Sequence, residues 1–337
     1  DWKNRKSWPS SSSKQQFCKL KEYGQIPAGD IQLTSLLYPF EHNFPRFIFS
    51  KYRWWKNSRL DKTLPKLNRK QNWLTVIDRL GAPGDALITA NVIRCIKDRY
   101  PKIKINCITP HPELIKYDHS IDSINKRETF YSFDSSYWEL IVRKASHVNI
   151  IAHNMNRLGI KEFTYNSNFF LNSEESEWAK KVIPSTIKPI IAICTRSKET
   201  VKNWPKTYWE RLIDSLRNDY FIIQIGDKKE LIFDEILSFS GKYTMRESAA
   251  LLSQASLFIG PDSLLMHIAN GLEIPSVILF GGSRPVQCLG YDQNINLSSS
   301  PHCSPCWIHD GFETCDHQVK CMNEISKESV LDAVTSL

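Results

Sequence analysis

The chain contains two successive series of short apolar runs that alternate with amphipathic stretches, and this pattern constrains its fold more than any other feature. In the first series, an apolar run at residues 74–80 ends at the turn sequence of residues 81–85, and residues 86–100 carry apolar side chains near helical spacing. Residues 103–109 form the next apolar run. The second series extends over residues 189–282. Alternating strands and helices build parallel sheets covered by helices, so the sequence predicts two doubly wound α/β units.

The order of these elements also predicts where a ligand binds. Open α/β sheets bind ligands at the carboxyl ends of their strands, so site residues are expected in the loops that follow the strands. The other predicted elements are a helix at 147–159 that ends at Gly159, strands at 190–194, 220–225, 257–259 and 276–280, and helices at 205–217, 228–239, 245–254 and 263–271.

Length and charge suggest a body with a distinct N-terminal segment. A chain of 337 residues is long enough for two domains. No apolar run approaches the ~20 residues of a membrane-spanning helix, and the opening residues lack the apolar core of a signal peptide. Residues 1–70 hold 15 Lys and Arg against 5 Asp and Glu, whereas the remaining residues hold 29 against 31. The net charge of +8 therefore belongs to the N-terminal segment, which suggests contact with an anionic partner.

Aromatic and cationic side chains are mixed in residues 44–59 of that segment. This composition fits a patch at a membrane interface or a surface that binds the acceptor of a reaction. It fits equally well an extension that packs its aromatic rings on the body and leaves its charges in water. A basic arm is also a feature of nucleic-acid-binding proteins.

The segment of residues 259–281 has the pattern of an anion site. A predicted strand ends at Gly260-Pro261-Asp262, and Ser263 begins a helix on which His267 lies one turn further along the same face. Free N–H groups at a helix N-terminus bind phosphate well. Taken alone, the motif fits an ordinary capped helix with a packed histidine at least as well.

Five blocks stand in order along the chain and make the pattern more specific. The blocks are RLGAPGDALIT at 79–89, KNWP at 202–205, IGD at 225–227, GPDSLLMHIAN at 260–270 followed by Phe280-Gly281, and a cysteine-rich tail that ends CMNEI at 321–325. Together they resemble glycosyltransferase family 9, the heptosyltransferase-like enzymes, and the resemblance extends from Leu74 to about Val330.

The resemblance implies a GT-B architecture, in which two Rossmann-like domains face a cleft, and an inverting transfer. Residues 71–186 would then be the acceptor domain and residues 187–337 the nucleotide-sugar domain. Asp85 matches the carboxylate that serves as general base on the acceptor hydroxyl in such enzymes. A carboxylate within hydrogen-bond reach can remove that proton as the new bond forms. Asp85 could also cap the helix that follows it.

The resemblance also implies a donor site in the second half. Lys202 matches the family lysine that approaches the donor phosphates, although Arg196 and Lys198 are close alternatives in the sequence. The other matched donor residues are Thr195, Gly226, Asp227, Met245, Asp262, Ser263 and His267. A developing diphosphate needs positive partners in place beforehand, and these residues would supply them without a metal ion or other cofactor in the transfer step.

One position departs from the family pattern. The family usually has glycine after Asp-Ser or Asp-Thr, whereas this chain has Leu264. Glycine lets the backbone approach a phosphate or a sugar closely, and leucine adds bulk there. The identity of the donor and its pose are therefore open.

Four of the nine cysteines are clustered in the tail. Cys303, Cys306, Cys315 and Cys321 have the spacing C-x2-C-x8-C-x5-C, which can enclose zinc or iron tetrahedrally. Because four protein ligands leave no open coordination position, such a metal would be structural. Reduced thiols without a metal, or two disulfides, are the alternatives.

The sequence as a whole predicts an inverting glycosyltransferase that moves heptose or a related sugar from a nucleoside-diphosphate donor, with ADP favoured. The resemblance suggests a glycan or lipid-linked acceptor in bacterial surface glycan assembly, and a cytoplasmic protein with peripheral contact at the inner membrane face. A nucleic-acid-binding protein with a zinc-knuckle-like tail and an inactive sugar-nucleotide-binding module are the competing hypotheses. The first leaves the α/β body unexplained, and Leu264 is the best support for the second.

Overall fold

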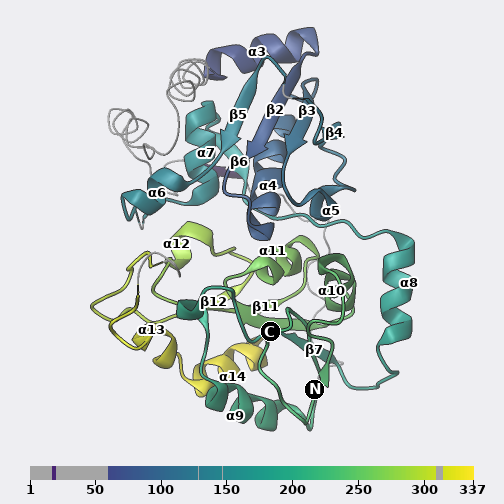
Figure 1. Ribbon diagram of the computed structural model, residues 1–337, viewed down its shortest axis with the longest axis vertical. Helices are drawn as coiled ribbons and strands as arrows, with labels where there is room; N and C mark the ends of the chain where they lie inside the picture. The colour runs from purple at the N-terminus through teal and green to yellow at the C-terminus, as the bar shows by residue number, and fades with distance from the viewer. Residues whose placement is uncertain (1–16, 20–59, 128, 146, 309–313) are drawn as a thin grey trace.

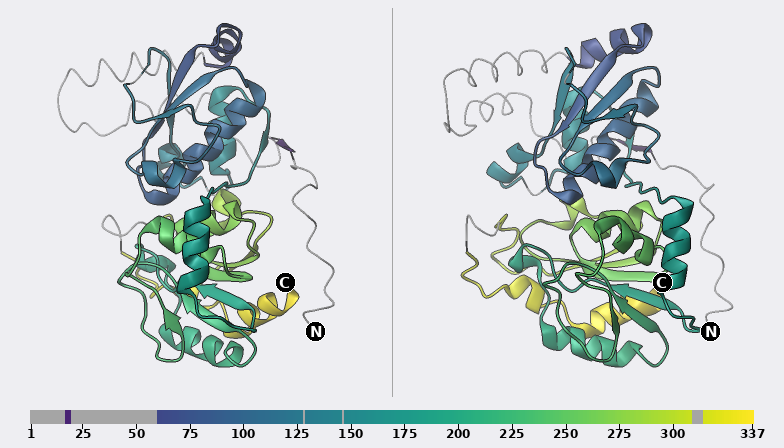
Figure 2. Two further views of the ribbon diagram at one scale, coloured as in Figure 1. Left: turned by 90° about the vertical axis from the view of Figure 1, so that its right-hand side faces the viewer. Right: turned by 45° about the vertical axis from the view of Figure 1, so that its right-hand side comes forward.

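The computed structural model describes residues 17–19, 60–127, 129–145, 147–308 and 314–337. It consists of two α/β halves, one above the other in Figure 1 and again in the turned views of Figure 2. The larger sheets are parallel throughout, with strand orders β4-β3-β2-β5 in the first half and β12-β11-β10-β7-β8-β9 in the second. The predicted pair of doubly wound parallel units is confirmed. The patch at residues 44–59 lies outside the described residues.

The first half is built around β2 and α4. The strand is buried along all but its first residue, and α4 is buried on every side over its first three turns because it lies between the sheet, α7 and the second half. The elements are β1 (Phe17–Lys19), α3 (Leu60–Lys70), β2 (Trp73–Asp78), α4 (Pro83–Arg99), β3 (Lys104–Ile108), α5 (Pro112–Ile115), β4 (Ser123–Ile124), β5 (Ser132–Ser135), α6 (Trp138–Val142), α7 (Ile150–Leu158) and β6 (Glu162–Thr164).

The helices α3 and α7 complete the core of this half. The helix α3 buries Leu60, Leu64 and Leu67, so residues 60–70 of the basic segment pack against the first half. The helix α7 begins at Asn149, whose side chain accepts two backbone hydrogen bonds, and ends at Gly159 in the left-handed conformation, as the sequence predicts.

The second half follows a connecting helix, α8, that packs on α10. Its central strands β10 and β11 are buried at every residue, which is typical of a parallel sheet covered on both faces. The elements are α8 (Ser173–Val182), β7 (Ile190–Ile193), the 3-10 helix η3 (Thr200–Lys202), α9 (Lys206–Leu216), β8 (Phe221–Gln224), β9 (Leu237–Ser238), α10 (Met245–Leu252), β10 (Leu257–Pro261), α11 (Leu264–Gly271), β11 (Ser276–Phe280), α12 (Val286–Leu289), β12 (Ile295–Ser298), α13 (Lys320–Asn323) and α14 (Lys327–Ser336).

The helix predicted at residues 228–239 is wrong. The segment is a series of turns that ends in the short edge strand β9. Tertiary hydrogen bonds take the backbone groups that a helix would use: Leu231 N donates to Thr195 Oγ1 at 3.1 Å, and Leu231 O accepts from Gln224 Nε2 at 2.8 Å. Contacts made far along the chain therefore override local helix propensity here.

Arg246 of α10 joins the two halves. Its guanidinium is bidentate to Glu175 of α8, with two N–O distances of 2.6 Å. The same group donates to the Phe170 carbonyl at 2.7 Å and, in the first half, to the Glu113 carbonyl at 3.0 Å. Bidentate arginine–carboxylate pairs fix geometry as well as adding stability, so this clasp sets the orientation of the halves.

No helix within the described residues has both the length and the apolar character needed to cross a bilayer.

Candidate functional site

The N-termini of two helices face each other where the halves meet. The start of α4 lies against α11, as Figure 1 shows. A Cβ added to Gly84 would lie 3.2 Å from His267 Cδ2 and 4.0 Å from Leu264 Cα. Glycine at this position therefore permits the close approach of the two halves, and Leu264, which departs from the family pattern, lies at that contact. Two helix N-termini that meet in this way favour an anion between them.

Asp85 lies at this meeting point and is 7% exposed. Its Oδ1 accepts a hydrogen bond from the Tyr137 hydroxyl at 2.8 Å, and its Oδ2 accepts one from Ala82 N at 3.1 Å. The second bond satisfies the backbone N–H of Ala82, the N-cap residue of α4. The helix begins at Pro83 with Ala82 as its N-cap, so Asp85 lies inside the first turn and is not the N-cap of a helix that follows it. The Tyr137 bond holds its carboxylate in place.

The protonation of Asp85 suits a base that works near neutral pH. Burial raises its pKa to about 6; the Tyr137 hydrogen bond opposes this rise, and the nearby Asp78 carboxylate adds to it. Asp78 itself is held by Thr109 Oγ1 and by Gly81 N, both at 2.9 Å. A carboxyl group whose pKa lies close to the working pH is an effective proton acceptor.

Lys202 is buried, so it is not a solvated loop lysine. Its Nζ lies 2.9 Å from Asp262 Oδ2 and 3.3 Å from Glu199 Oε2. Burial by itself would raise the pKa of Asp262, but Lys202 and Arg284 hold it below its ordinary value. The lysine and the aspartate that the sequence singled out therefore form one ion pair at the end of β10.

Arg284, in the loop after β11, brings a second buried cation to the same place. Its Nη2 lies 3.6 Å from Glu199 Oε1, and its guanidinium carbon lies 5.7 Å from the ring centre of Tyr137 in the first half. Its positive charge lowers the pKa of Asp85 and the pKa of Asp262. Asp85, Asp262 and the buried cations Lys202 and Arg284 thus form one electrostatic cluster.

His267 is buried and uncharged at neutral pH, because burial lowers its pKa to about 4. Its Nδ1 lies 2.7 Å from the Tyr291 hydroxyl. A Tyr291 hydroxyl that donates to Nδ1 leaves the ring proton on Nε2, the nitrogen nearest to Gly84. His267 can therefore offer an N–H donor at the contact between the halves.

Thr195 is bound by a glutamate that the sequence did not single out. Glu230 accepts hydrogen bonds from Thr195 N at 2.5 Å, from Thr195 Oγ1 at 2.6 Å and from Arg196 N at 3.0 Å. Burial raises the pKa of Glu230, and these bonds oppose the rise. The carboxylate therefore occupies the backbone amides at the carboxyl end of β7.

The remaining predicted donor residues are spread along the same edge of the sheet. Ser263 occupies the N-cap position of α11, but its hydroxyl makes no capping hydrogen bond. Gly226 has a φ of 139°, and a Cβ there would lie 2.5 Å from Glu230 Oε1, so glycine is required. Asp227 is exposed and binds Lys229 N, while Met245 begins α10 and is half-buried.

Five residues of the cluster escaped the sequence analysis: Tyr137, Glu199, Glu230, Arg284 and Tyr291. Only Arg284 had a usable signal, because it follows the glycine pair that closes a strand, and loops after strands carry ligands in this fold class. The others come from turns, a one-turn helix and a loop whose positions depend on tertiary packing.

The predicted metal centre does not form in the described residues. Cys303, Cys306, Cys315 and Cys321 are free thiols, and no three His, Cys, Asp or Glu side chains in the described ranges are placed to hold a metal ion. The thiols are nevertheless neighbours: burial raises the pKa of Cys306 and of Cys321, and Cys315 adds to the rise in both. Residues 309–313, inside this segment, are outside the description.

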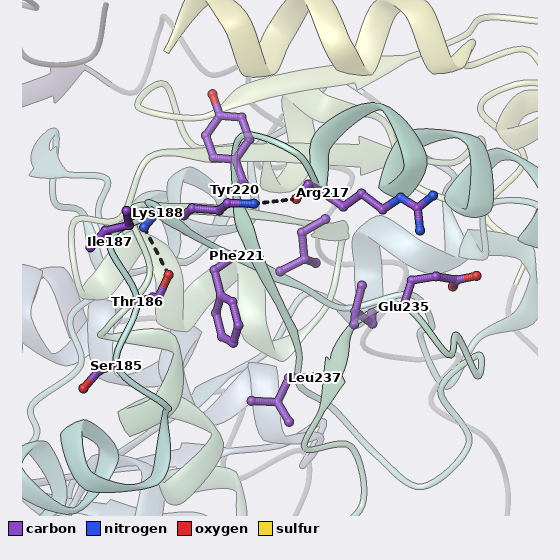
Figure 3. Close-up of a pocket in the computed structure, with 11 residues that line it drawn as sticks. Ser185, Thr186, Ile187, Lys188, Arg217, Tyr220, Phe221, Glu235 and Leu237 are labelled. Carbon is purple, nitrogen blue, oxygen red and sulfur yellow. Dashed lines mark hydrogen bonds between the residues drawn. The ribbon is translucent and has the colours of Figure 1, made fainter.

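A surface cavity of about 450 Å³ lies elsewhere. Figure 3 shows the residues that line it. These residues adjoin the amino-terminal ends of β7 and β8, the edge opposite to the cluster. Its lining includes Lys188, whose Nζ donates to the Arg217 carbonyl at 3.2 Å. Because ligands of doubly wound sheets bind at the other edge, this cavity is not the candidate site.

Comparison with solved structures shows which fold the chain shares. A glycosyltransferase of family 9 from Veillonella parvula aligns with 78% of this chain and 96% of its own, at 14% identity and a TM-score of 0.60. The ADP-heptose lipopolysaccharide heptosyltransferase II of E. coli aligns with 78% and 98%, at 14% identity and a TM-score of 0.56. The iron-containing dodecameric glycosyltransferase TibC of enterotoxigenic E. coli aligns with 78% and 75%, at 20% identity and a TM-score of 0.61. At these identities the likeness shows the fold, and it confirms the expected GT-B architecture.

Comparison of sequences shows the family. Lipooligosaccharide heptosyltransferase 2 of Haemophilus influenzae is 26% identical over 132 residues, which cover 34% of this chain and 38% of the relative. Lipopolysaccharide heptosyltransferase 2 of Salmonella typhimurium is 27% identical over 116 residues, which cover 30% and 33%. The match thus spans less than two fifths of either relative. The model of glycosyltransferase family 9 (heptosyltransferase) matches residues 130–310, more than half of the chain. The chain belongs to glycosyltransferase family 9, the heptosyltransferase family.

Proposed function

We propose that the protein transfers a sugar, heptose or a close relative, from a nucleoside-diphosphate donor to an acceptor hydroxyl with inversion. The observation that carries this proposal is the juxtaposition of Asp85, a carboxylate with a pKa of about 6, with the buried cations Lys202 and Arg284 at the meeting point of the halves. One group accepts a proton and the others stabilise negative charge, and sugar transfer needs both.

The transfer uses these groups in one displacement. The acceptor oxygen attacks the anomeric carbon and forms the new C–O bond, while its proton passes to Asp85. The bond from the anomeric carbon to the phosphate oxygen breaks, and its electron pair leaves with the nucleoside diphosphate. Lys202 and Arg284, together with the N-terminus of α11, stabilise the charge that develops on this leaving group.

Donor, acceptor and location are proposed from the relatives. Solved family structures include TibC in complex with ADP-heptose, so we favour an ADP-linked heptose as donor, bound along Thr195, Gly226, Asp227, Met245, Asp262, Ser263 and His267. The curated relatives are named for lipooligosaccharide and lipopolysaccharide, which favours a bacterial surface glycan or lipid-linked acceptor and a cytoplasmic site of action at the inner membrane face.

The cysteine cluster keeps its predicted structural role as a part of this proposal. Four neighbouring thiols have the donor chemistry for zinc or iron, and Val319 N donates to Cys315 Sγ at 3.4 Å. The present arrangement is not a metal geometry, so ligation requires the thiols to move together. Elemental analysis of the purified protein tests this: less than a tenth of an equivalent of zinc and iron would refute it.

Thermal stability in the presence of ADP, GDP, UDP and CDP and their sugar conjugates tests the main proposal. A ligand that binds only the folded protein adds about 2.7 kcal/mol to its stability at 100 times its dissociation constant. We expect the largest shift with ADP compounds and turnover of ADP-heptose when a glycan acceptor is supplied. No shift with any nucleotide contradicts the proposal. A shift without turnover across many acceptors favours an inactive binding module.

A further inference from the structure

One carboxylate joins the two buried cations of the cluster. Glu199 places Oε2 3.3 Å from Lys202 Nζ and Oε1 3.6 Å from Arg284 Nη2. The lysine and arginine side chains are 6% and 10% exposed, and that of Glu199 is 21% exposed. Each carboxylate oxygen thus faces a different cation, which is how two oxygens of a bound phosphate group would face them.

The hold of Glu199 on these cations is loose. Charge-assisted hydrogen bonds from nitrogen to oxygen are about 2.7–2.9 Å long, and the Lys202–Asp262 pair has that length at 2.9 Å. Both Glu199 distances are longer. Glu199 is also the residue just before the one-turn helix η3, and its side chain makes no capping bond there. Its two contacts to the cations are not part of a regular element, whereas Asp262 directly follows β10.

Two buried hydroxyls, each on a residue that adjoins a member of the cluster in the chain, lack an acceptor oxygen or nitrogen among the described residues. Ser283, next to Arg284 in the chain, is 2% exposed, and its Oγ has no hydrogen-bond partner among the described residues. The Ser263 hydroxyl, next to Asp262, is buried near the Cys194 thiol, a weak partner, and makes no hydrogen bond to nitrogen or oxygen within the described ranges. Buried polar atoms without partners are costly, and a ligand rich in acceptor oxygens would satisfy both.

We propose that Lys202 and Arg284 form the subsite for the donor diphosphate, and that Glu199 is a placeholder that binds both cations until the diphosphate displaces it. This inference rests on the proposed function and assigns two residues to it, Arg284 as a ligand of the leaving group and Glu199 as its competitor. Buried cations are costly unless carboxylates neutralise them. Asp262 pairs with Lys202, and Glu199 is the carboxylate that links Lys202 to Arg284 before the diphosphate binds. A diphosphate carries more charge and more acceptor oxygens, so it takes the place of Glu199.

Arg284 would place the donor diphosphate close to Asp85. Its guanidinium lies beside Tyr137, the residue that donates to Asp85. A diphosphate held by Arg284 is therefore next to the proposed base, which is where the anomeric carbon must be.

Glu199→Gln provides the sharpest test, because glutamine keeps the size of the side chain and removes its charge. We expect inorganic pyrophosphate, measured by isothermal titration calorimetry, to bind this variant about three- to tenfold more tightly, equivalent to roughly 0.7–1.4 kcal/mol of lost competition. Glu210→Gln makes the same change in an exposed ion pair with Lys206, and it should bind pyrophosphate as the wild type does. Unchanged or weaker binding by Glu199→Gln would overturn the inference.

Three further variants distinguish the proposed competition from misfolding and from a general effect of charge. Glu199→Asp keeps the charge but is one methylene too short to reach both cations, so it should bind pyrophosphate with an intermediate gain. Arg284→Gln should weaken pyrophosphate binding about tenfold, and adding Glu199→Gln to it should restore less than the single change gains, because coupled residues are not additive. Full restoration would remove Arg284 from the subsite.

The same titrations separate this inference from the proposed function. If ADP stabilises the wild type but changes at Glu199 and Arg284 leave pyrophosphate and ADP binding unaltered, only the placeholder subsite fails. If neither ADP nor pyrophosphate binds the wild type or any variant, the proposed function fails with it.

Discussion

Asp85→Asn should abolish sugar transfer and at the same time stabilise the protein at alkaline pH. Removal of a general base costs about 10²–10⁴-fold in rate. Asparagine fits the site, because its Oδ1 can accept from Ala82 N and its Nδ2 can donate to the Tyr137 oxygen. Binding of the donor nucleotide should persist. In the wild type, kcat/KM should rise with pH and level off above an apparent pKa of about 6, since only the ionised carboxylate accepts a proton.

The gain in stability follows from the raised pKa. The folded protein holds the Asp85 proton up to about pH 6, whereas in the unfolded chain it is lost near pH 4. As pH rises between these values, the unfolded state releases its proton first, so Asp85 makes the wild type progressively less stable. Asparagine avoids this loss. Asp85→Asn should therefore gain nothing at pH 4 and about 2–3 kcal/mol at pH 8.

Denaturant unfolding at pH 4 and pH 8, together with a transfer assay, checks this prediction. Asp332→Asn is the matched control, because it makes the same change at an exposed position of α14, away from the cluster. It should keep full activity. More than a tenth of wild-type turnover in Asp85→Asn, or an equal change in stability at both pH values, would contradict the assigned role.

Lys202→Met should destabilise the protein by about 3 kcal/mol and weaken donor binding at least tenfold. Loss of one partner of a buried ion pair leaves the other charge uncompensated, at a cost of roughly 3–5 kcal/mol. Arg284, which also acts on Asp262, should keep the loss at the lower end. Methionine retains most of the apolar stem of lysine, so the loss of stability and of donor affinity measures the contribution of the ammonium charge.

Chemical denaturation and ADP titration measure the two effects separately. Lys206→Met removes an exposed lysine at the start of α9, and it should change stability by less than about 0.5 kcal/mol. Adding Asp262→Asn to Lys202→Met should recover stability without recovering ADP affinity. A Lys202→Met protein as stable as the wild type would show that the pair with Asp262 does not hold the site together.

The resemblance singled out three residues near the ends of regular elements. Asp85 lies in the first turn of α4, Lys202 ends η3 just before α9, and Asp262 follows β10. The structure brings the three to one place. Whether they act as the resemblance implies stays a prediction. The helix expected at residues 228–239 was wrong, because its apolar residues serve an edge strand and a turn that Thr195 and Gln224 hold.

The partners of those residues could not be predicted in the same way. Tyr137 lies 52 positions from Asp85, and Arg284 lies 82 positions from Lys202. Such pairs depend on how two sheets and their loops are placed in space, which hydrophobic periodicity does not encode. The cysteine spacing, by contrast, was a strong local signal, yet it did not by itself bring the four thiols into a metal geometry.

The Arg246 clasp decides where this chain can be cut for chimeras with its relatives. Arg246 belongs to the second half, but its bidentate partner Glu175 precedes the first strand of that half. A crossover at residue 187 would pair Arg246 with whatever residue the foreign parent carries in place of Glu175. A crossover before Asn172, the N-cap of α8, would keep α8, Glu175 and Arg246 together from the same parent.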